Sequence, residues 1–116
     1  MNNIFIRGGC LCGNVRYRAK GNAYSPCVCH CRTCQQAADA DSISWVSFSI
    51  SNFKYESNPP KEYQSSEGVT RTFCGYYGTT LTYQTRKEEI DLSLATLDNP
   101  EQIEPTEEIW LSQRLP

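Results

Sequence analysis

Six of the seven cysteines of this 116-residue chain lie in two short clusters. The first holds Cys10 and Cys12, the second has four cysteines within residues 27–34, and the seventh, Cys74, follows far downstream. A disulfide requires Cα atoms within about 7 Å and Cβ vectors that face each other, which cysteines two residues apart on an extended chain rarely achieve. Thiolates at such spacings can instead converge on one soft cation, and a distant residue can complete the set. The spacing therefore predicts zinc binding rather than a disulfide framework.

Length and composition predict a single domain over residues 1–116. The chain is 39% hydrophobic and 21% charged, which allows one modest core, so a bound metal can carry part of the folding energy. The N-terminal residues lack the apolar stretch of a signal peptide, and no segment approaches the roughly 18 apolar residues of a membrane span. We therefore expect a cytoplasmic protein with reduced thiols and no membrane partner.

Charge is unevenly placed along the chain, although the net charge is only −2. Residues 1–38 contain five basic and no acidic side chains, whereas residues 88–108 contain eight acidic and no basic ones. A basic half around the cysteines could attract an anionic small substrate. Alternatively, the two halves form solvated surfaces of opposite sign. The small net charge provides no overall field for nucleic acid, so no nucleic-acid partner is expected.

Hydrophobic side chains alternate mostly with a period of two, which is typical of strands. The pattern predicts strands at residues 15–20, 43–50, 70–74, 80–84, 89–95 and 108–111. One short helix is expected over residues 32–40, and residues 98–101 are typical of a capped helical turn with proline near its first position. No internal repeat or linker is visible, and the predicted strands outnumber the helices, so we expect one mostly-β domain.

Three ordered motifs resemble one known family. They are Gly-Gly-Cys-Leu-Cys-Gly-Asn-Val-Arg-Tyr at residues 8–17, Cys-His-Cys-Arg-Thr-Cys at residues 29–34, and a segment at residues 68–81 that begins Gly-Val-Thr-Arg-Thr-Phe-Cys and ends Gly-Thr-Thr-Leu. With residues 97–100 and 109–110, they are similar to the glutathione-dependent formaldehyde-activating enzyme family, whose domain is shared with centromere protein V. The resemblance implies a β-tent fold of small coiled antiparallel sheets, two zinc sites and carbon–sulfur chemistry.

Cys29, Cys31 and Cys34 match the catalytic zinc motif of that family. Three protein ligands leave one tetrahedral position open, where a substrate thiol could lose its proton and add to an aldehyde carbonyl, or the reverse. The resemblance thus implies a zinc-dependent carbon–sulfur lyase whose partners are a small thiol such as glutathione and a small aldehyde. The alternative is a catalytically inactive zinc-binding module or scaffold domain, with a structural zinc knuckle closed by a fourth residue.

Cys10, Cys12 and Cys74 match three of the four cysteines of the family's structural zinc site. The family has Cys-x-x-Cys-Gly-Thr at the second half, and Tyr77 occupies the position of the fourth sulfur. A neutral phenol with a pKa near 10 is a poor replacement for a thiolate. Either three sulfurs and a substitute hold zinc, or the site has no metal and Tyr77 fills the gap by burying its ring, which we favour. We therefore expect one zinc site per chain, with the second doubtful.

Cys27 has three competing interpretations. On an extended strand Cys27, Cys29 and Cys31 share one side, so Cys27 could be a fourth ligand that closes the catalytic site. It could instead replace the missing partner of the other cluster. The third interpretation, which we favour, is a small buried residue with no metal role.

The remaining candidates carry weaker signals. His30 lies between two proposed ligands, and strand alternation places it on the opposite face, so it is not expected to bind metal. Arg32 and Arg71 could pair with substrate carboxylates, but a solvated surface position is favoured for Arg71. Aromatic side chains are expected in the core or pocket wall, namely Trp45, Tyr55, Tyr63, Phe73 and Tyr83.

Overall fold

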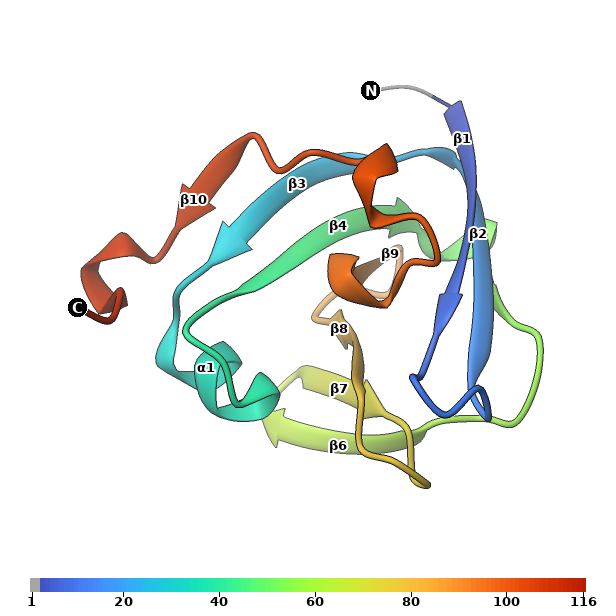
Figure 1. Cartoon of the computed structure of the whole chain (residues 1–116), viewed down its shortest axis with the longest axis horizontal. Helices are drawn as coiled ribbons and strands as arrows, with labels where there is room; N and C mark the ends of the chain where they lie inside the picture. Colours follow the sequence, from blue (N-terminus) through green and yellow to red (C-terminus); the bar gives the residue numbers. More distant parts are fainter. Residues whose placement is uncertain (1–2) are drawn as a thin grey trace.

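Two β-sheets form the molecule in the computed structural model, which describes residues 3–116 (Figure 1). The small sheet has the strand order β1-β2-β5, and the large sheet has the order β10-β3-β4-β9-β8-β7-β6. The large sheet curves from β10 and β3 at the top of Figure 1 to β6 at the bottom, with β1 and β2 on the right and helix α1 on the left. Neighbouring strands pair antiparallel, except that β10 and β3 are parallel. This mostly-β architecture of coiled sheets confirms the predicted β-tent class.

The bounds of the elements within residues 3–116 are as follows. The strands are β1 (Asn3–Gly9), β2 (Arg16–Asn22), β3 (Tyr24–Cys29), β4 (Ile43–Ser49), β5 (Phe53–Tyr55), β6 (Lys61–Ser66), β7 (Val69–Phe73), β8 (Thr80–Gln84), β9 (Glu89–Ser93) and β10 (Glu107–Ile109). The helices are α1 (Arg32–Ala38) and the short 3-10 turns η1 (Ile50–Asn52), η2 (Leu94–Thr96), η3 (Pro100–Gln102) and η4 (Leu111–Gln113).

The central strand β4 is buried on both faces. Val46 and Phe48 are fully buried in a core that contains residues of both sheets, together with Ile90 and Leu92 of β9. Side chains alternate along a strand, so Trp45 of β4 points to the other face. There a second apolar cluster forms, made of Cys27, Cys29, Cys34, Ile43 and Trp45. The fold therefore places three buried cysteines, with the partly buried Cys31 packed against them, on the face of the large sheet away from the main core.

The six predicted strands are confirmed as β2, β4, β7, β8, β9 and β10, with small differences at their ends. Pattern reading missed β1, β3, β5 and β6. The last of these is an edge strand, Lys61–Ser66, whose side chains are mostly exposed and polar, so it has no apolar alternation to detect. Tyr63 on this strand is 65% exposed, so its expected place in the core or a pocket wall was wrong.

Both predicted helical segments are present. Helix α1 ends at Ala38 rather than residue 40, because Asp39 adopts a left-handed conformation with φ 51°. Pro100 occupies the first turn of η3, but the side chain of Asn99 makes no capping hydrogen bond. In the described part of the chain, no helix has the length and apolar character needed to cross a bilayer.

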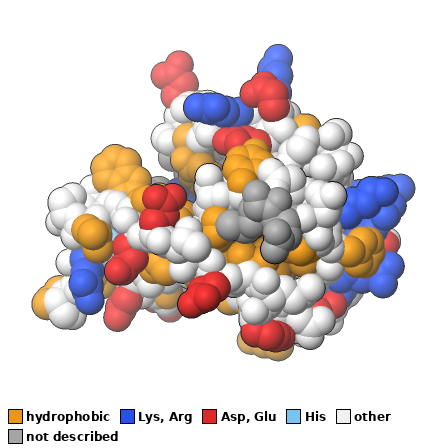
Figure 2. Space-filling model, turned by 90° about the horizontal axis from the view of Figure 1, so that it is seen from above, with side chains coloured by type: hydrophobic (Ala, Val, Ile, Leu, Met, Phe, Trp, Pro, Cys, Tyr) orange, Lys and Arg blue, Asp and Glu red, His pale blue; other side chains and the backbone are white. Residues whose placement is uncertain are grey.

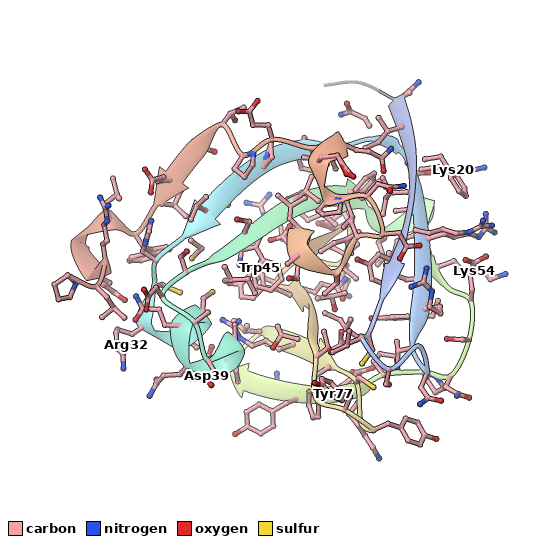
Figure 3. The ribbon with its side chains drawn as sticks, viewed as in Figure 1. Lys20, Arg32, Asp39, Trp45, Lys54 and Tyr77 are labelled. Carbon is pink, nitrogen blue, oxygen red and sulfur yellow. The ribbon has the colours of Figure 1, made fainter. Side chains whose placement is uncertain are left out.

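The two oppositely charged halves of the sequence are brought together by the fold. Arg16 pairs with Asp98 at 2.5 Å, and His30 Nε2 lies 2.8 Å from Glu108 Oε1. Acidic and basic side chains are interspersed on the face seen in Figure 2, whereas Lys20 and Lys54 lie on the outer side of the small sheet in Figure 3. Residues of the two charged segments therefore pair with each other in the folded molecule.

Candidate metal centre

Cys29, Cys31 and Cys34 come together where β3 ends and α1 begins. Their sulfur atoms all lie within 4.8 Å of one another, and Cys29 and Cys34 are buried. Cys29 is the last residue of β3, whereas Cys31 is the N-cap of α1 and accepts a hydrogen bond from the Cys34 N–H at 3.3 Å. The strand-to-helix turn thus folds a Cys-x-Cys-x-x-Cys spacing into a compact triad.

The dimensions of this triad fit a zinc ion. A Zn–S bond of about 2.3 Å in tetrahedral geometry places sulfur atoms about 3.8 Å apart. The Sγ atoms of Cys29 and Cys34 are 3.6 Å apart. Thiolate sulfur is also a ligand that zinc prefers. These residues could therefore hold a zinc ion with three sulfurs.

The surroundings of Cys34 favour its ionised form. Hydrogen bonds from the Cys29 S–H, and further from Cys31 and Arg71, outweigh burial and lower the pKa of Cys34 to about 5. The pKa of Cys29 is raised, because its proton is held by Cys34 and its sulfur is buried. One thiolate is thus already stabilised in the metal-free triad, and a thiolate is the form that binds metal.

The surface position favoured for Arg71 from the sequence was wrong. Arg71 is only 8% exposed rather than solvated on the surface. Its Nη1 and Nη2 atoms each lie 3.7 Å from Cys34 Sγ, its Nε donates to Ser65 Oγ, and its guanidinium stacks 4.8 Å from the centre of the Tyr83 ring. Arg71, which lies on β7, therefore contacts the Cys34 sulfur with both terminal guanidinium nitrogens. Arg32, in contrast, is exposed on α1 and donates to Gln35 Oε1.

A cavity of about 270 Å³ opens beside this triad. All three cysteines line it, and Trp45 and Tyr83 form an aromatic wall with ring centres 5.8 Å apart. Trp45 lies inside the curve of the large sheet in Figure 3. A ligand in this cavity can therefore reach the sulfur atoms while its remainder contacts aromatic side chains.

Carboxylates also line this cavity, namely Glu89, Asp91 and Glu107. They come from the acidic segment that the sequence assigned to a separate surface. Asp91 accepts a hydrogen bond from Ser47 Oγ at 2.5 Å, and burial raises its pKa from 3.8 to about 6. Of the two interpretations of the charge pattern, the one in which basic side chains surround these cysteines was thus wrong, since Arg71 is the one Lys or Arg among the described residues that line the cavity.

Cys27 lies in the same cavity but belongs to neither metal-sized group of sulfurs among residues 3–116. It is on β3 opposite Trp45 and is 8% exposed, and burial raises its pKa to about 11. This placement favours the interpretation of a small buried residue over either ligand role. His30 faces away from the cavity and pairs with Glu108, and it too is in neither group.

A second triad consists of Cys10, Cys12 and Cys74. Its sulfur atoms also lie within 4.8 Å of one another, with 3.3 Å between Cys10 and Cys12 and 3.6 Å between Cys12 and Cys74. Two similar turns hold it, in which the N–H groups of Gly13 and Gly78, both with positive φ, donate to the carbonyls of Cys10 and Cys74. This group could also hold a metal ion, as the resemblance implied.

Tyr77 does not fill the fourth position of this second triad. Its side chain is 61% exposed, and only its backbone N–H contacts the cluster, 3.4 Å from Cys74 Sγ. The expectation that its ring packs into the gap was therefore wrong. The nearest additional polar atom is on Thr79, whose Oγ1 lies 3.1 Å from Cys10 Sγ, while Cys12 itself is exposed.

Comparisons with known proteins agree with this architecture. The chain is similar over 88% of its length to the crystal structure of a Rhodobacter sphaeroides protein, covering 98% of that chain, with a TM-score of 0.67 at 19% identity. No curated protein matches the chain. The model of one family, described as glutathione-dependent formaldehyde-activating enzyme, matches residues 5–113. Two cysteine triads on a coiled β fold and a family match over nearly the whole sequence lead to one conclusion: this chain belongs to the glutathione-dependent formaldehyde-activating enzyme family.

Proposed function

We propose that this protein is a zinc-dependent carbon–sulfur lyase that joins a small thiol to a small aldehyde, or cleaves the product. In the forward direction a sulfur–carbon bond forms at the aldehyde carbon, and the thiol proton ends on the former carbonyl oxygen. The reverse reaction breaks that bond and returns the proton to sulfur. No electrons are gained or lost overall, so no redox cofactor is needed.

The observation that carries this proposal is the position of the Cys29, Cys31 and Cys34 sulfurs on the wall of a cavity. A purely structural cluster is closed by a fourth protein ligand. Cys27, the nearest candidate in sequence, is outside the metal-sized group. The triad therefore has a side from which a small thiol can approach.

The protein's own side chains have distinct tasks in this proposal. Zinc held by the three thiolates would lower the pKa of an incoming thiol and polarise an aldehyde oxygen. Arg71 keeps Cys34 ionised and oriented by donating two N–H groups to its sulfur. Trp45 and Tyr83 restrict the entry of water, which would compete with the thiol. Since the ligands must stay reduced, we also propose a reducing compartment such as the cytoplasm.

A zinc-binding module without turnover is the second candidate. The second triad favours it, because one of its three sulfurs belongs to the exposed Cys12 and Tyr77 adds no ligand. A protein that retains metal only to stabilise its fold would still contain both triads. Turnover separates the two candidates.

Metal content and exchange kinetics test the proposal together. Protein purified without chelator should contain at least one zinc per chain by mass spectrometry, and Cys31→Ser should lose it. Exchange between formaldehyde, 2-mercaptoethanol and their adduct, followed by magnetisation-transfer NMR, should be faster with the parent protein than with Cys31→Ser. Cys12→Ser is the matched control, since it removes a sulfur from the other triad and should leave exchange intact.

Two results would refute the proposal. One is zinc-free protein from a chelator-free preparation. The other is a cobalt-substituted protein whose visible spectrum ignores added thiol and changes only in Cys27→Ala, because Cys27 would then close the site.

A further inference from the structure

We infer that the thiol substrate of this cavity carries a positively charged nitrogen, and that Asp91, with Glu89 and Glu107, selects for it. The inference rests on the proposed function, because it concerns the ligand that approaches the Cys29, Cys31 and Cys34 triad. It is the opposite of the anionic substrate that one of the two interpretations of the charge pattern suggested.

Strand register explains how the carboxylates reach the cavity. Residues directly opposite each other on paired strands share one face of a sheet. Ser47 of β4 is paired with Asp91 of β9, Asp91 with Tyr83 of β8, and Tyr83 with Arg71 of β7. One row of side chains therefore crosses four strands beneath the cavity, with Asp91 near its centre.

A neighbouring row brings a second carboxylate from the other end of the sheet. Glu107 of β10 is paired with Cys27 of β3, which is paired with Trp45 of β4. Glu89 lies on β9 two residues before Asp91, on the same face. The acidic groups thus approach the cavity from both β9 and β10.

These carboxylates are not neutralised by protein cations. Within residues 3–116, none of the three forms a salt bridge with a Lys, Arg or His side chain. Asp91 and Glu89 accept hydrogen bonds from the neutral hydroxyls of Ser47 and Tyr24. The one guanidinium in the cavity, that of Arg71, is bound to the Cys34 sulfur.

The charge balance of the cavity therefore favours a cation. A divalent ion held by three thiolates has a net charge of −1, which the Arg71 guanidinium beside Cys34 balances. The three carboxylates therefore set the sign of the charge in the cavity. A carboxylate-bearing thiol would meet repulsion in a partly enclosed space, where screening by salt is weak. The ring of Trp45 also attracts a cationic nitrogen, whereas the Tyr83 ring already carries the Arg71 guanidinium.

The backbone at the rim supports a site built for recognition. Two of the non-glycine residues with positive φ within the described chain, Ser25 (φ 52°) and Trp110 (φ 59°), line this cavity. Such conformations cost free energy and are concentrated where side chains are held for a ligand. Trp110 is 58% exposed at the rim, in reach of a ligand that enters from solvent.

Three thiols of similar size and different charge test the inference. Cobalt-substituted protein is titrated with thiocholine, 2-mercaptoethanol and 3-mercaptopropionate, and Kd is read from the visible absorption spectrum. The quaternary nitrogen of thiocholine cannot bind metal, so its effect is electrostatic. We expect the Kd ratio of 3-mercaptopropionate to thiocholine to fall at least tenfold in Asp91→Asn relative to the parent. Comparing ratios between proteins cancels the intrinsic acidities of the three thiols.

Two further variants complete the design. Glu107→Gln, at an exposed position, should lower the same ratio even if Asp91→Asn folds poorly. Glu101→Gln is the control, because Glu101 is exposed on η3 outside the cavity and should leave the ratio unchanged. Equal ratios in the parent, Asp91→Asn and Glu107→Gln would overturn the inference and leave the proposed function standing. A spectrum that no thiol changes would instead overturn the proposed function, and this inference with it.

Discussion

Replacing Arg71 with methionine should raise the pKa of the Cys34 thiol. The substitution removes two N–H groups that lie 3.7 Å from Cys34 Sγ and keeps most of the buried aliphatic volume. A hydrogen bond to a charged group is worth about 1.5–3 kcal/mol, and these contacts are long, so we take about 1.5 kcal/mol. Since 1.36 kcal/mol corresponds to one pKa unit, the pKa of Cys34 should rise by about one unit.

The direction of the pH effect follows from this change. The Cys34 pKa of about 5 is below the ordinary thiol value, so the thiolate persists down to acidic pH in the parent protein. In Arg71→Met the thiolate should be lost about one pH unit earlier as the pH falls. Metal binding requires the thiolate, so zinc should also be released at a higher pH.

Alkylation kinetics measure this directly. Chelator-treated protein is exposed to iodoacetamide between pH 4 and pH 8, and the rate at Cys34 is followed by peptide mass spectrometry. Arg32→Met is the matched control, since Arg32 is exposed and contacts no cysteine sulfur in the described structure. Arg71→Lys should give an intermediate midpoint, because one ammonium replaces the two-pronged donor. An unchanged midpoint in folded Arg71→Met would refute the reasoning. It would show that Cys29 and Cys31, without Arg71, stabilise the Cys34 thiolate.

Other expectations concern stability and the second triad. Burial raises the pKa of Asp91 from 3.8 to about 6, so between these pH values the folded carboxyl keeps a proton that the unfolded chain has lost. The free energy of unfolding should therefore fall by up to about 3 kcal/mol as the pH rises from 4 to 7. Urea denaturation of Asp91→Asn should lack this pH dependence. Phe48→Ala should lower the free energy of unfolding by about 3–5 kcal/mol, since Phe48 is fully buried. Phe5→Ala, at a 48% exposed site, should change it by less than about 0.5 kcal/mol. Similar losses in both variants would contradict the assignment of Phe48 to the core. Tyr77→Cys should let the Cys10, Cys12 and Cys74 triad retain zinc against a mild chelator, as counted by mass spectrometry. Tyr76→Cys, at the adjacent exposed position, is the control. Equal zinc retention in Tyr76→Cys would show that a cysteine at position 77 has no specific role.

Local patterns accounted for much of the fold and for one half of the site. The strands β4, β8 and β9 could be predicted because alternation with period two reports burial on a pleated surface. Strand β6 could not, since a polar edge strand has no buried face to mark it. Cys29, Cys31 and Cys34 lie within six residues of sequence, so their meeting depends on a single turn.

Spacing and ligand chemistry in the sequence alone thus determined that this chain carries sulfur clusters suited to a metal. The place of Cys74 in one of them followed from the family resemblance, and the exclusion of Cys27 from both needed the structure. Only the tertiary structure decided what surrounds these clusters. Arg71 reaches Cys34 from 37 residues away, and Asp91 enters the cavity through the register of β4, β9 and β8. The Tyr77 ring is exposed, and the backbone N–H of this residue is the group that contacts Cys74. Contacts between distant segments depend on strand order and register across the whole sheet, which no local residue pattern encodes.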